Sequence, residues 1–598
     1  MLKEREALLE KYPDIYFFLS YTDYSAYEMT SSADGKVNAV RKKGKTEEFL
    51  HSISDIDEEV KLWAASLDLD DIEILYVYGV GLGYCYAEIK NWLHKLPQRR
   101  VVFLEDDLGA IAAFFQAEAA AEITEDPQVV LRFVRSWKAD LDNLAQTFPC
   151  AHVAVTALPA YAKKSRAKIS RIRLQLLRSS SSFHALFSEA LFSHKLLQNL
   201  APNLKRLPSA FYANELEGRY QGVPAIICGA GPSLKSVIGT LKTLENRALI
   251  IAGGSAIAAL SNQGVVPHLA MALDPNPEEY ERLKASAAFE VPLLFGSRLQ
   301  PDVFSTCNGP IGYLKSDTGG LFESWIEERL SIDGEAIGPD LGREAFSVTT
   351  LAIAYAYTLG CTPIILAGVD LAYTGKQRYA DGVVAQNAID KGQLKKDKRS
   401  TDRLLHRKDR LGNPVDTMVK WVMESECIGA YAKAHPEREF LSATEGGIGF
   451  PGIEYTPLEE IAEQKMKQTH DLRGRIHSDI QNLKMTQIST PRIFALYEQL
   501  RLSLRRCLEL CEEILYEIKS AQTPLPTTKM ALLEHDLQSE SAYEALMAVA
   551  VPALDHLLLR YMGRSEKDKV DQQRIKWHRV KEIIESQLQT LDSDGACS

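Results

Sequence analysis

The stretch AIICGAGPSL, Ala225 to Leu234, is a short apolar run that breaks into a glycine-rich turn before helix-forming residues resume. Glycines let the backbone approach a ligand closely, and the helix that follows presents unpaired N–H groups and a positive dipole end to an anion. The spacing is neither a Walker pattern nor a complete G-x-G-x-x-G. We therefore predict a buried strand that enters a phosphate-binding turn, with a plain tight connection as the alternative.

Apolar runs alternate with helical windows from about residue 223 to 455, which predicts an α/β fold with a Rossmann-like parallel sheet. The predicted strands are AIIC, ALIIAGG, LAMALD, VPLLFG and PIILAGVD. Ligands of such sheets bind beyond the carboxyl ends of the strands. Polar or small residues follow the strands there, among them Gly253, Gly254, Ser255, Asp274, Ser297 and Asp370.

An earlier segment, IEILYVYGVGLG, predicts a second and smaller nucleotide fold. Its strand leads into Gly79, Gly81 and Gly83, and a further strand ends at Glu105. An acidic residue about 20 positions after such a turn is where these folds bind a ribose. The spacing is closer to a methyltransferase opening than to a dinucleotide site, but no other methyltransferase signature follows. A purely structural turn is the alternative.

We expect three domains, because single hydrophobic cores stop growing at roughly 250 to 300 residues. Residues 1–215 form an N-terminal α/β domain, Rossmann-like from about residue 70, with a helical connector. Residues 216–457 form the central domain, and residues 458–598 a C-terminal helical bundle. In the bundle an apolar stripe is predicted to pack inward; it comprises Leu500, Leu504, Cys507, Leu508 and Cys511.

The composition of the chain excludes several classes of function. Its 598 residues carry a formal net charge of −11, which disfavours general binding to nucleic acid or anionic membranes. No apolar run of about 18 residues predicts a membrane span, and the N-terminus lacks a signal-peptide core. The cysteines form no C-x-x-C pair, so no metal site is expected. We expect a cytoplasmic protein; a homo-oligomer is compatible with the sequence.

The segment PIILAGVDLAYTGKQRYADG places two tyrosines, Tyr373 and Tyr379, on a loop that follows a predicted strand. Hydroxyl groups there can donate hydrogen bonds to a phosphate without carrying charge. The alternative is that the rings pack and leave the hydroxyls in water.

Four segments together resemble the core of the Maf (motility-associated factor) glycosyltransferases. They are AIICGAGPSL, IIAGGSAIAALSNQGVVPHLAMALDP, SVTTLAIAYAYTLGCTPIILAGVDLAYTGKQRYADG and ATEGGIGFPG. Members of that family attach nonulosonic acids, such as pseudaminic or legionaminic acid, to flagellin. The Gly79 opening and the helical tail also suit the family's three-part layout.

The same core is similar to bacterial sialyltransferases that use CMP-sialic acid. That resemblance implies a donor site built on the turn Gly229, Ala230, Gly231, Pro232 and Ser233. Ala230 stands where the sialyltransferases have an asparagine that contacts the donor. A nucleotide-binding Thr-Ser-Gly element corresponds loosely to Phe346, Ser347 and Val348. The tyrosines that bond the leaving phosphate fall on Tyr373 and Tyr379.

The resemblance also implies a histidine general base, for which His406 lies 27 residues after Tyr379. Asp274 and Asp370 compete for that role. His406 belongs to a basic segment, residues 391–410, that could close over an anionic donor. The implied reaction is transfer from a CMP-activated sugar to a Ser or Thr hydroxyl of flagellin or another protein acceptor, with inversion and without an essential metal or cofactor.

Two other functions stay open at this point. Shorter relatives of the core resemble hydroxymethylpterin diphosphokinases, which would use ATP and Mg²⁺ on carboxylates such as Asp274 and Asp370. The third reading is a non-catalytic protein that binds flagellin or an export partner.

Overall fold

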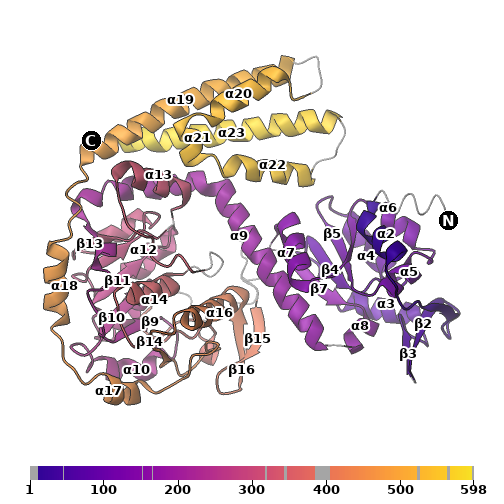
Figure 1. Cartoon of the computed structure of the whole chain (residues 1–598), viewed down its shortest axis with the longest axis horizontal. Helices are drawn as coiled ribbons and strands as arrows, with labels where there is room; N and C mark the ends of the chain where they lie inside the picture. Colours follow the sequence, from indigo (N-terminus) through magenta and orange to yellow (C-terminus); the bar gives the residue numbers. More distant parts are fainter. Residues whose placement is uncertain are drawn as a thin grey trace. The chain divides into compact units, whose positions relative to one another are not determined.

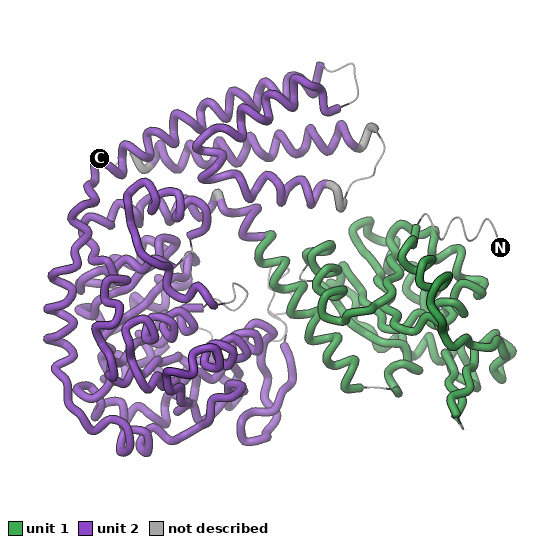
Figure 2. The backbone as a smooth tube through the Cα atoms, viewed as in Figure 1, with its two compact units in different colours: residues 1–187, 392–401 green, residues 188–391, 402–598 purple. Residues whose placement is uncertain are grey.

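The structure is a computed structural model that describes residues 11–44, 46–150, 152–164, 166–316, 319–341, 347–383, 404–520, 525–561 and 566–595. The chain forms two compact units (Figure 2). Unit 1 comprises residues 1–187 with 392–401, and unit 2 comprises residues 188–391 with 402–598. The boundary falls within the long helix α9 (Arg166–Leu204).

Unit 1 is built on a parallel sheet with the strand order β6-β5-β4-β7 (Figure 1). All five residues of β4 are buried, which is why the strand reads as one unbroken apolar run. The elements are α2 (Pro13–Tyr21), β1 (Glu28–Ser31), β2 (Val37–Lys43), β3 (Thr46–Phe49), α3 (Ile56–Ala65), β4 (Ile74–Tyr78), α4 (Cys85–His94), β5 (Arg100–Glu105), α5 (Leu108–Phe114), α6 (Ala120–Glu125), β6 (Val129–Phe133), α7 (Trp137–Thr147), β7 (Val153–Ala157) and α8 (Pro159–Lys164).

Unit 2 contains an eight-stranded sheet with the order β17-β14-β9-β10-β11-β12-β13-β8, in which every neighbouring pair is parallel. The strands are β8 (Phe211–Tyr212), β9 (Ala225–Cys228), β10 (Leu249–Gly253), β11 (Leu269–Ala272), β12 (Leu293–Phe295), β13 (Ile311–Tyr313), β14 (Ile364–Ala367) and β17 (Phe440–Ser442). The predicted strands are confirmed as β9 to β12 and β14. The short strands β8, β13 and β17 were not predicted.

Both faces of this sheet are covered, and side chains alternate between them. Ile226 and Cys228 of β9 join one hydrophobic cluster, whereas Ala225 and Ile227 join another. Full burial of one such isoleucine stabilises the fold by about 1.5–3 kcal/mol. The helices and the hairpin of this part are α10 (Leu234–Leu241), α11 (Ser255–Ser261), α12 (Pro277–Leu283), α13 (Gly320–Leu330), α14 (Val348–Thr358), β15 (Leu404–Lys408), β16 (Pro414–Met418) and α16 (Val419–Ala434).

The C-terminal part of unit 2 is helical, and α19 and α23 run along each other (Figure 1). Its elements are α17 (Leu458–Lys465), α18 (Leu472–Gln481), α19 (Thr490–Ser520), α20 (Thr528–Gln538), α21 (Ser541–Leu546), α22 (Ala550–Tyr561) and α23 (Glu566–Gly595). Leu500, Leu504, Cys507 and Cys511 of α19 are buried, as predicted, and Leu508 is half-buried. They belong to the same hydrophobic cluster as Phe295 of β12, so these helices and one face of the sheet share a core.

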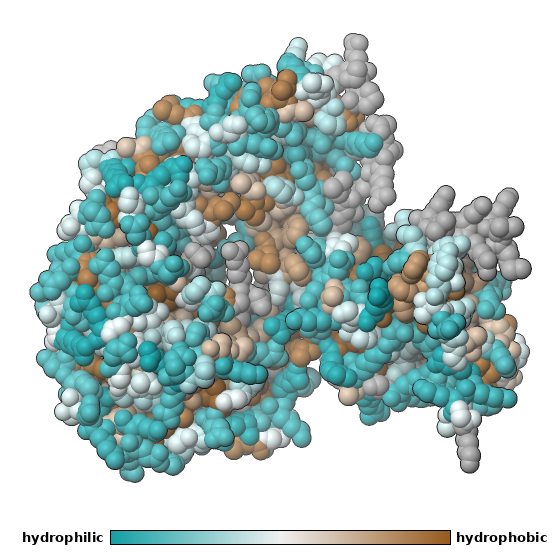
Figure 3. Space-filling view, in the orientation of Figure 1, coloured by the Kyte–Doolittle hydropathy of each residue, from teal (hydrophilic) through white to brown (hydrophobic). Residues whose placement is uncertain are grey.

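The α/β class, with two parallel sheets and a C-terminal helical region, is therefore confirmed. The domain boundaries at residues 215 and 457 stay predictions. On the face shown in Figure 3, hydrophilic residues cover most of the surface. Among the described residues, no helix combines the length and the apolar character that crossing a membrane requires.

Candidate functional site

Strand β9 marks the point where the order of the central sheet reverses. The chain runs from β9 outward to β10, β11, β12 and β13, and then returns to place β14 on the other side of β9. The carboxyl ends of strands at such a switch point form a crevice where α/β proteins bind ligands. The turn predicted from AIICGAGPSL follows β9, and the tyrosine loop follows β14. The topology therefore brings the two most distinctive sequence segments together.

The glycines of the turn after β9 allow this turn and the loop after β14 to lie close together. The Gly229 N–H donates to the Ala367 carbonyl and the Gly231 N–H to the Gly368 carbonyl, each at 2.8 Å. A Cβ at Gly229 would lie 2.5 Å from the Gly368 oxygen, and a Cβ at Gly231 would enter the Asp370 carboxylate. Larger residues at Gly229 or Gly231 would therefore force the turn after β9 and the loop after β14 apart.

Asp370 clamps the turn from the β14 side. Its carboxylate accepts hydrogen bonds from the Ser233 hydroxyl at 2.5 Å and the Ser233 N–H at 3.3 Å, and its carbonyl accepts the Ile448 N–H at 3.1 Å. Asp370 is almost fully buried, and this burial raises the pKa of its carboxyl. The residue thus joins three loops, a geometry that suits a structural clamp better than an exposed general base.

Most backbone donors of the turn are engaged within the fold. The Gly231 and Ser233 N–H groups bond the β14 loop, and the Leu234 N–H bonds the Gly231 carbonyl. The Ala230 N–H has no acceptor among the described residues, and Ala230 is half-buried. Of the predicted phosphate donors in this turn, Ala230 is therefore the one that the structure leaves open.

Tyr373 lies beside Trp421 of α16. The Tyr373 ring lies 5.1 Å from the Trp421 ring, and its hydroxyl donates to the Met418 sulfur at 3.9 Å. Tyr379 is half-buried, and the Arg378 guanidinium lies 5.1 Å from the Tyr379 ring and 5.9 Å from Trp421. Arg378 thus adds a cation to this loop, which the sequence analysis missed although the residue directly precedes Tyr379.

His406 lies on the β15–β16 hairpin, which contacts the tyrosine loop. Its Nδ1 is 2.5 Å from the Asp416 carboxylate, and the side chain is 79% exposed. The Asp416 carbonyl accepts the Tyr373 N–H at 2.9 Å, and the Thr417 hydroxyl donates to the Leu371 carbonyl at 2.6 Å. Asp416 therefore links His406 to the loop that carries Tyr373. The basic stretch before it, residues 391–403, lies outside the described residues.

Ser347 lies at the N-terminus of α14 and is linked to α16. Its hydroxyl accepts the Thr350 N–H as a helix cap and donates to the Glu424 carboxylate at 2.6 Å. Burial raises the pKa of Glu424 to about 7. Because Trp421 and Glu424 lie on the same helix, α16 supports both Tyr373 and Ser347. Phe346, the other named residue of this element, lies outside the described residues.

Gly253, Gly254 and Asp274 lie at the carboxyl ends of β10 and β11. A Cβ at Gly253 would lie 2.5 Å from Val348, so this glycine permits α14 to approach the sheet. Half-buried Ser255 begins α11. The Asp274 carboxylate accepts the Asn276 N–H at 3.0 Å and lies 3.7 Å from the Arg282 guanidinium. Among the described residues, no polar contact joins the Asp274 side chain to the tyrosine loop.

Glu279 is a buried carboxylate in this region that the sequence analysis missed. It accepts a hydrogen bond from Arg282 at 3.2 Å, and burial raises its pKa to about 7. A Cβ at Gly254 would lie 3.2 Å from its carboxylate. In the sequence, Glu279 reads as an ordinary acidic residue in the first turn of a helix, so no signal distinguished it.

The glycine turn of unit 1 is filled by side chains of the protein itself. A Cβ at Gly79 would meet the Tyr161 ring at 2.5 Å, and a Cβ at Gly81 would meet His51 at the same distance. Glu105 is fully buried and accepts the Tyr161 hydroxyl at 2.6 Å and the Val80 N–H at 3.2 Å. Glu105, the acidic residue expected to bind a ribose, therefore already accepts hydrogen bonds from groups of the protein itself.

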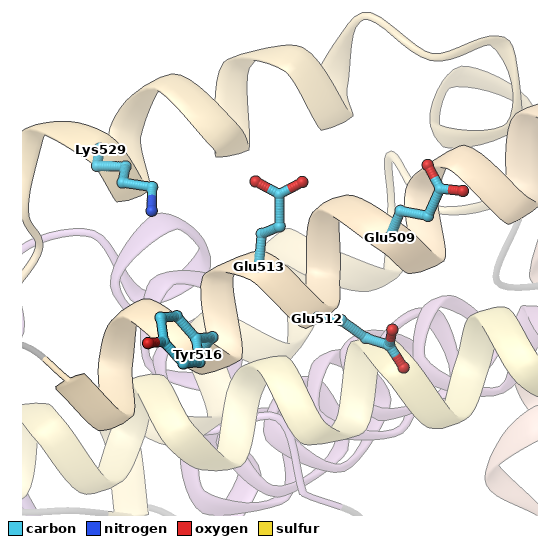
Figure 4. Close-up of a pocket in the computed structure, with 5 residues that line it drawn as sticks. All are labelled: Glu509, Glu512, Glu513, Tyr516 and Lys529. Atoms are coloured by element: carbon cyan, nitrogen blue, oxygen red, sulfur yellow. The ribbon is translucent and has the colours of Figure 1, made fainter.

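A shallow pocket of about 410 Å³ lies on α19 and α20 and is lined by Glu509, Glu512, Glu513, Tyr516 and Lys529 (Figure 4). Glu512 points away from Lys529 and bonds Lys581 of α23 at 2.6 Å. Glu509 bonds Arg506 at 2.9 Å. The pocket is a charged surface of the helical part, and none of the predicted site residues lines it.

Comparisons with known proteins agree with this architecture. A family model described as 6-hydroxymethylpterin diphosphokinase MptE-like matches residues 197–376. No curated protein matches the chain by sequence. A solved structure described as the Maf glycosyltransferase from Magnetospirillum magneticum AMB-1 aligns with a TM-score of 0.51 and 14% sequence identity, covering 100% of this chain and 96% of that one. The chain therefore has the fold of a Maf glycosyltransferase along its whole length, with an MptE-like domain at its centre.

Proposed function

We propose that the protein is a glycosyltransferase that moves a nonulosonic acid from a CMP-sugar donor to a Ser or Thr hydroxyl of flagellin. The observation that carries this proposal is the switch-point site. There the turn after β9 is clamped by Asp370 to the loop that bears Tyr373 and Tyr379. The whole-length likeness to a Maf glycosyltransferase supports the same assignment.

The loop that bears Tyr373 and Tyr379 offers the groups that a departing phosphate needs. Departure of CMP leaves negative charge on the phosphate, which hydroxyl donors and a cation stabilise. A thioether is a weak acceptor, so a phosphate oxygen would compete well with Met418 for the Tyr373 hydroxyl. Arg378 beside Tyr379 adds a positive charge that can form a paired contact with phosphate.

The acceptor hydroxyl needs a base at the other side of the reacting carbon. His406 is our proposed base, because its imidazole is exposed and bonded to a carboxylate. Asp370 is buried in the clamp, and Asp274 pairs with Arg282, so both are less suited to that role. Direct attack by the activated hydroxyl inverts the anomeric centre. The remaining predicted residues, at 229–233, 253–255 and 347, would border the nucleotide.

The proposal is tested with the double variant Tyr373→Phe and Tyr379→Phe. Loss of both hydroxyls removes two donors to the leaving phosphate, so we expect transfer to fall by roughly 10²-fold or more. Tyr516→Phe, on the exposed face of α19, is the matched control and keeps full activity. Wild-type transfer rates in the double variant, with an unchanged melting temperature, would refute the assignment.

The MptE-like match at residues 197–376 favours a second candidate, an ATP-dependent diphosphokinase. Such an enzyme requires Mg²⁺, whereas the transfer proposed here does not. Incubation with EDTA separates the two. Transfer from a CMP-sugar that survives EDTA supports the glycosyltransferase, and Mg²⁺-dependent consumption of ATP with hydroxymethylpterin supports the kinase.

A further inference from the structure

Asp416 of β16 contacts two of the residues on which the proposed transfer depends. Its carboxylate lies 2.5 Å from His406 Nδ1, and its carbonyl accepts the Tyr373 N–H at 2.9 Å. The antiparallel register of the hairpin sets His406 directly opposite Asp416. One residue thus ties the proposed base to the loop that holds the leaving phosphate.

The hydrogen bond determines which imidazole nitrogen is available. A carboxylate that accepts from Nδ1–H keeps the proton on that nitrogen and leaves Nε2 as the acceptor. The Asp416 side chain is 21% exposed and the His406 side chain 79% exposed, so the carboxylate is the anchored partner. An exposed imidazole without such a partner samples both tautomers and many ring orientations.

We infer that Asp416 is a positioning residue that holds His406 with Nε2 ready to accept a proton. This inference rests on the proposed function. In the reaction the acceptor oxygen bonds the anomeric carbon, the bond from that carbon to the phosphate oxygen breaks, and CMP leaves with the electron pair. The hydroxyl proton passes to His406 Nε2. Asp416 touches neither substrate and acts through the orientation of His406.

The test measures steady-state transfer by the full chain with Asp416→Asn. The asparagine keeps the main-chain bond to Tyr373, but its amide can donate to Nδ1 and so favour the wrong tautomer. We expect kcat to fall by roughly 10- to 100-fold while the KM for the donor stays within about twofold. Asp409→Asn removes a charge from the same hairpin, near its turn, and is the matched control with unchanged kcat.

A double-mutant cycle distinguishes positioning from a purely structural role. If Asp416 acts through His406, Asp416→Asn adds no further loss in a His406→Ala background. Independent losses that multiply, or a normal kcat in Asp416→Asn, would overturn the inference. Failure of the proposed function is a different result, because the wild-type protein itself would then transfer no sugar.

A second measurement does not depend on activity. Long-range ¹H–¹⁵N spectra of histidine-labelled full-length protein report the tautomer of each imidazole. The signal that disappears in His406→Ala is expected to show the Nδ1–H form in the wild type and to lose it in Asp416→Asn. A wild-type signal in the Nε2–H form would contradict the inference even if the variants are inactive.

Discussion

At the scale of single residues, the site depends on the close approach of the turn after β9 to the loop after β14. Gly229 and Gly231 are predicted to admit a phosphate, and in the structure their missing side chains also make room for the β14 loop. Asp370, predicted to border the donor or act as a base, is buried and accepts a hydrogen bond from the Ser233 hydroxyl, while its predicted role in the site stays a prediction. The sequence shows that a residue is small or acidic; it does not show whether a ligand or another loop fills the space beside it.

Gly231→Ala tests whether the turn after β9 must lie this close to the loop after β14. The new methyl group would lie 2.7 Å from the Gly368 oxygen and would also enter the Asp370 carboxylate. We expect a loss of about 1–3 kcal/mol in the free energy of unfolding, with weaker binding of CMP. Denaturant titration measures the first and calorimetry the second.

Gly239→Ala is the matched control, because Gly239 lies on α10 and a Cβ there meets nothing within 4 Å. Alanine is the better helix former, so this variant should be more stable by up to about 1 kcal/mol. Equal effects of the two substitutions would contradict the role given to Gly231.

At the scale of elements, the apolar runs predicted five strands of the central sheet correctly. The strands β8, β13 and β17 have only two or three residues each, and polar residues or glycines interrupt the sequence around them, whereas the equally short β12 lies in the longer apolar run VPLLFG. The tyrosine spacing pointed to the loop after β14, but the hairpin β15–β16 and the supporting role of α16 depend on contacts between distant segments. No local pattern identifies Trp421 or Glu424 as supports of that loop.

Glu424→Gln tests the support that α16 gives to Ser347. Burial raises the pKa of Glu424 to about 7, above the 4.5 usual for a glutamate, so its favourable contribution is complete below about pH 4.5 and is lost as pH rises through 7. Glutamine keeps an oxygen for the Ser347 hydroxyl and does not ionise. The variant should therefore gain stability over the wild type between pH 5 and pH 8, by on the order of 2–3 kcal/mol.

Melting temperatures of both proteins at pH 5 and pH 8 measure this gain. Other buried carboxyls, such as Glu279, titrate alike in both proteins and cancel in the difference. A difference in melting temperature that does not change with pH would show that Glu424 is not a buried acid in the folded protein.

At the scale of the whole molecule, two parallel α/β sheets occur in one chain, and they differ in what occupies the glycine turns that follow their strands β4 and β9. In unit 1, Tyr161 and His51 occupy the space beside Gly79 and Gly81. In unit 2, the Ala230 N–H meets no acceptor in the part of the chain that the structure describes, and Ser233 and Asp370 add polar groups to the turn. The sequence predicted both turns and favoured the central one, because no further methyltransferase signature follows the first. It could not show what fills the first turn, because Tyr161 and His51 come from distant positions.

Ligand-dependent stability separates the two turns. CMP at 100 times its Kd should stabilise the wild-type protein by about 2.7 kcal/mol, because it binds the native state alone. S-adenosylmethionine and NAD should leave the melting temperature unchanged. A shift with S-adenosylmethionine that is lost in a Gly83→Ala variant would instead assign a working cofactor site to unit 1.

The central claim is tested most directly by the intact mass of flagellin after incubation with this protein and a CMP-activated nonulosonic acid, in the presence of EDTA. The account predicts mass increments equal to whole numbers of the sugar residue with the wild-type protein and with Tyr516→Phe. It predicts almost none with the double variant Tyr373→Phe and Tyr379→Phe. An unchanged flagellin mass with the folded wild-type protein, across pseudaminic and legionaminic donors, would contradict it.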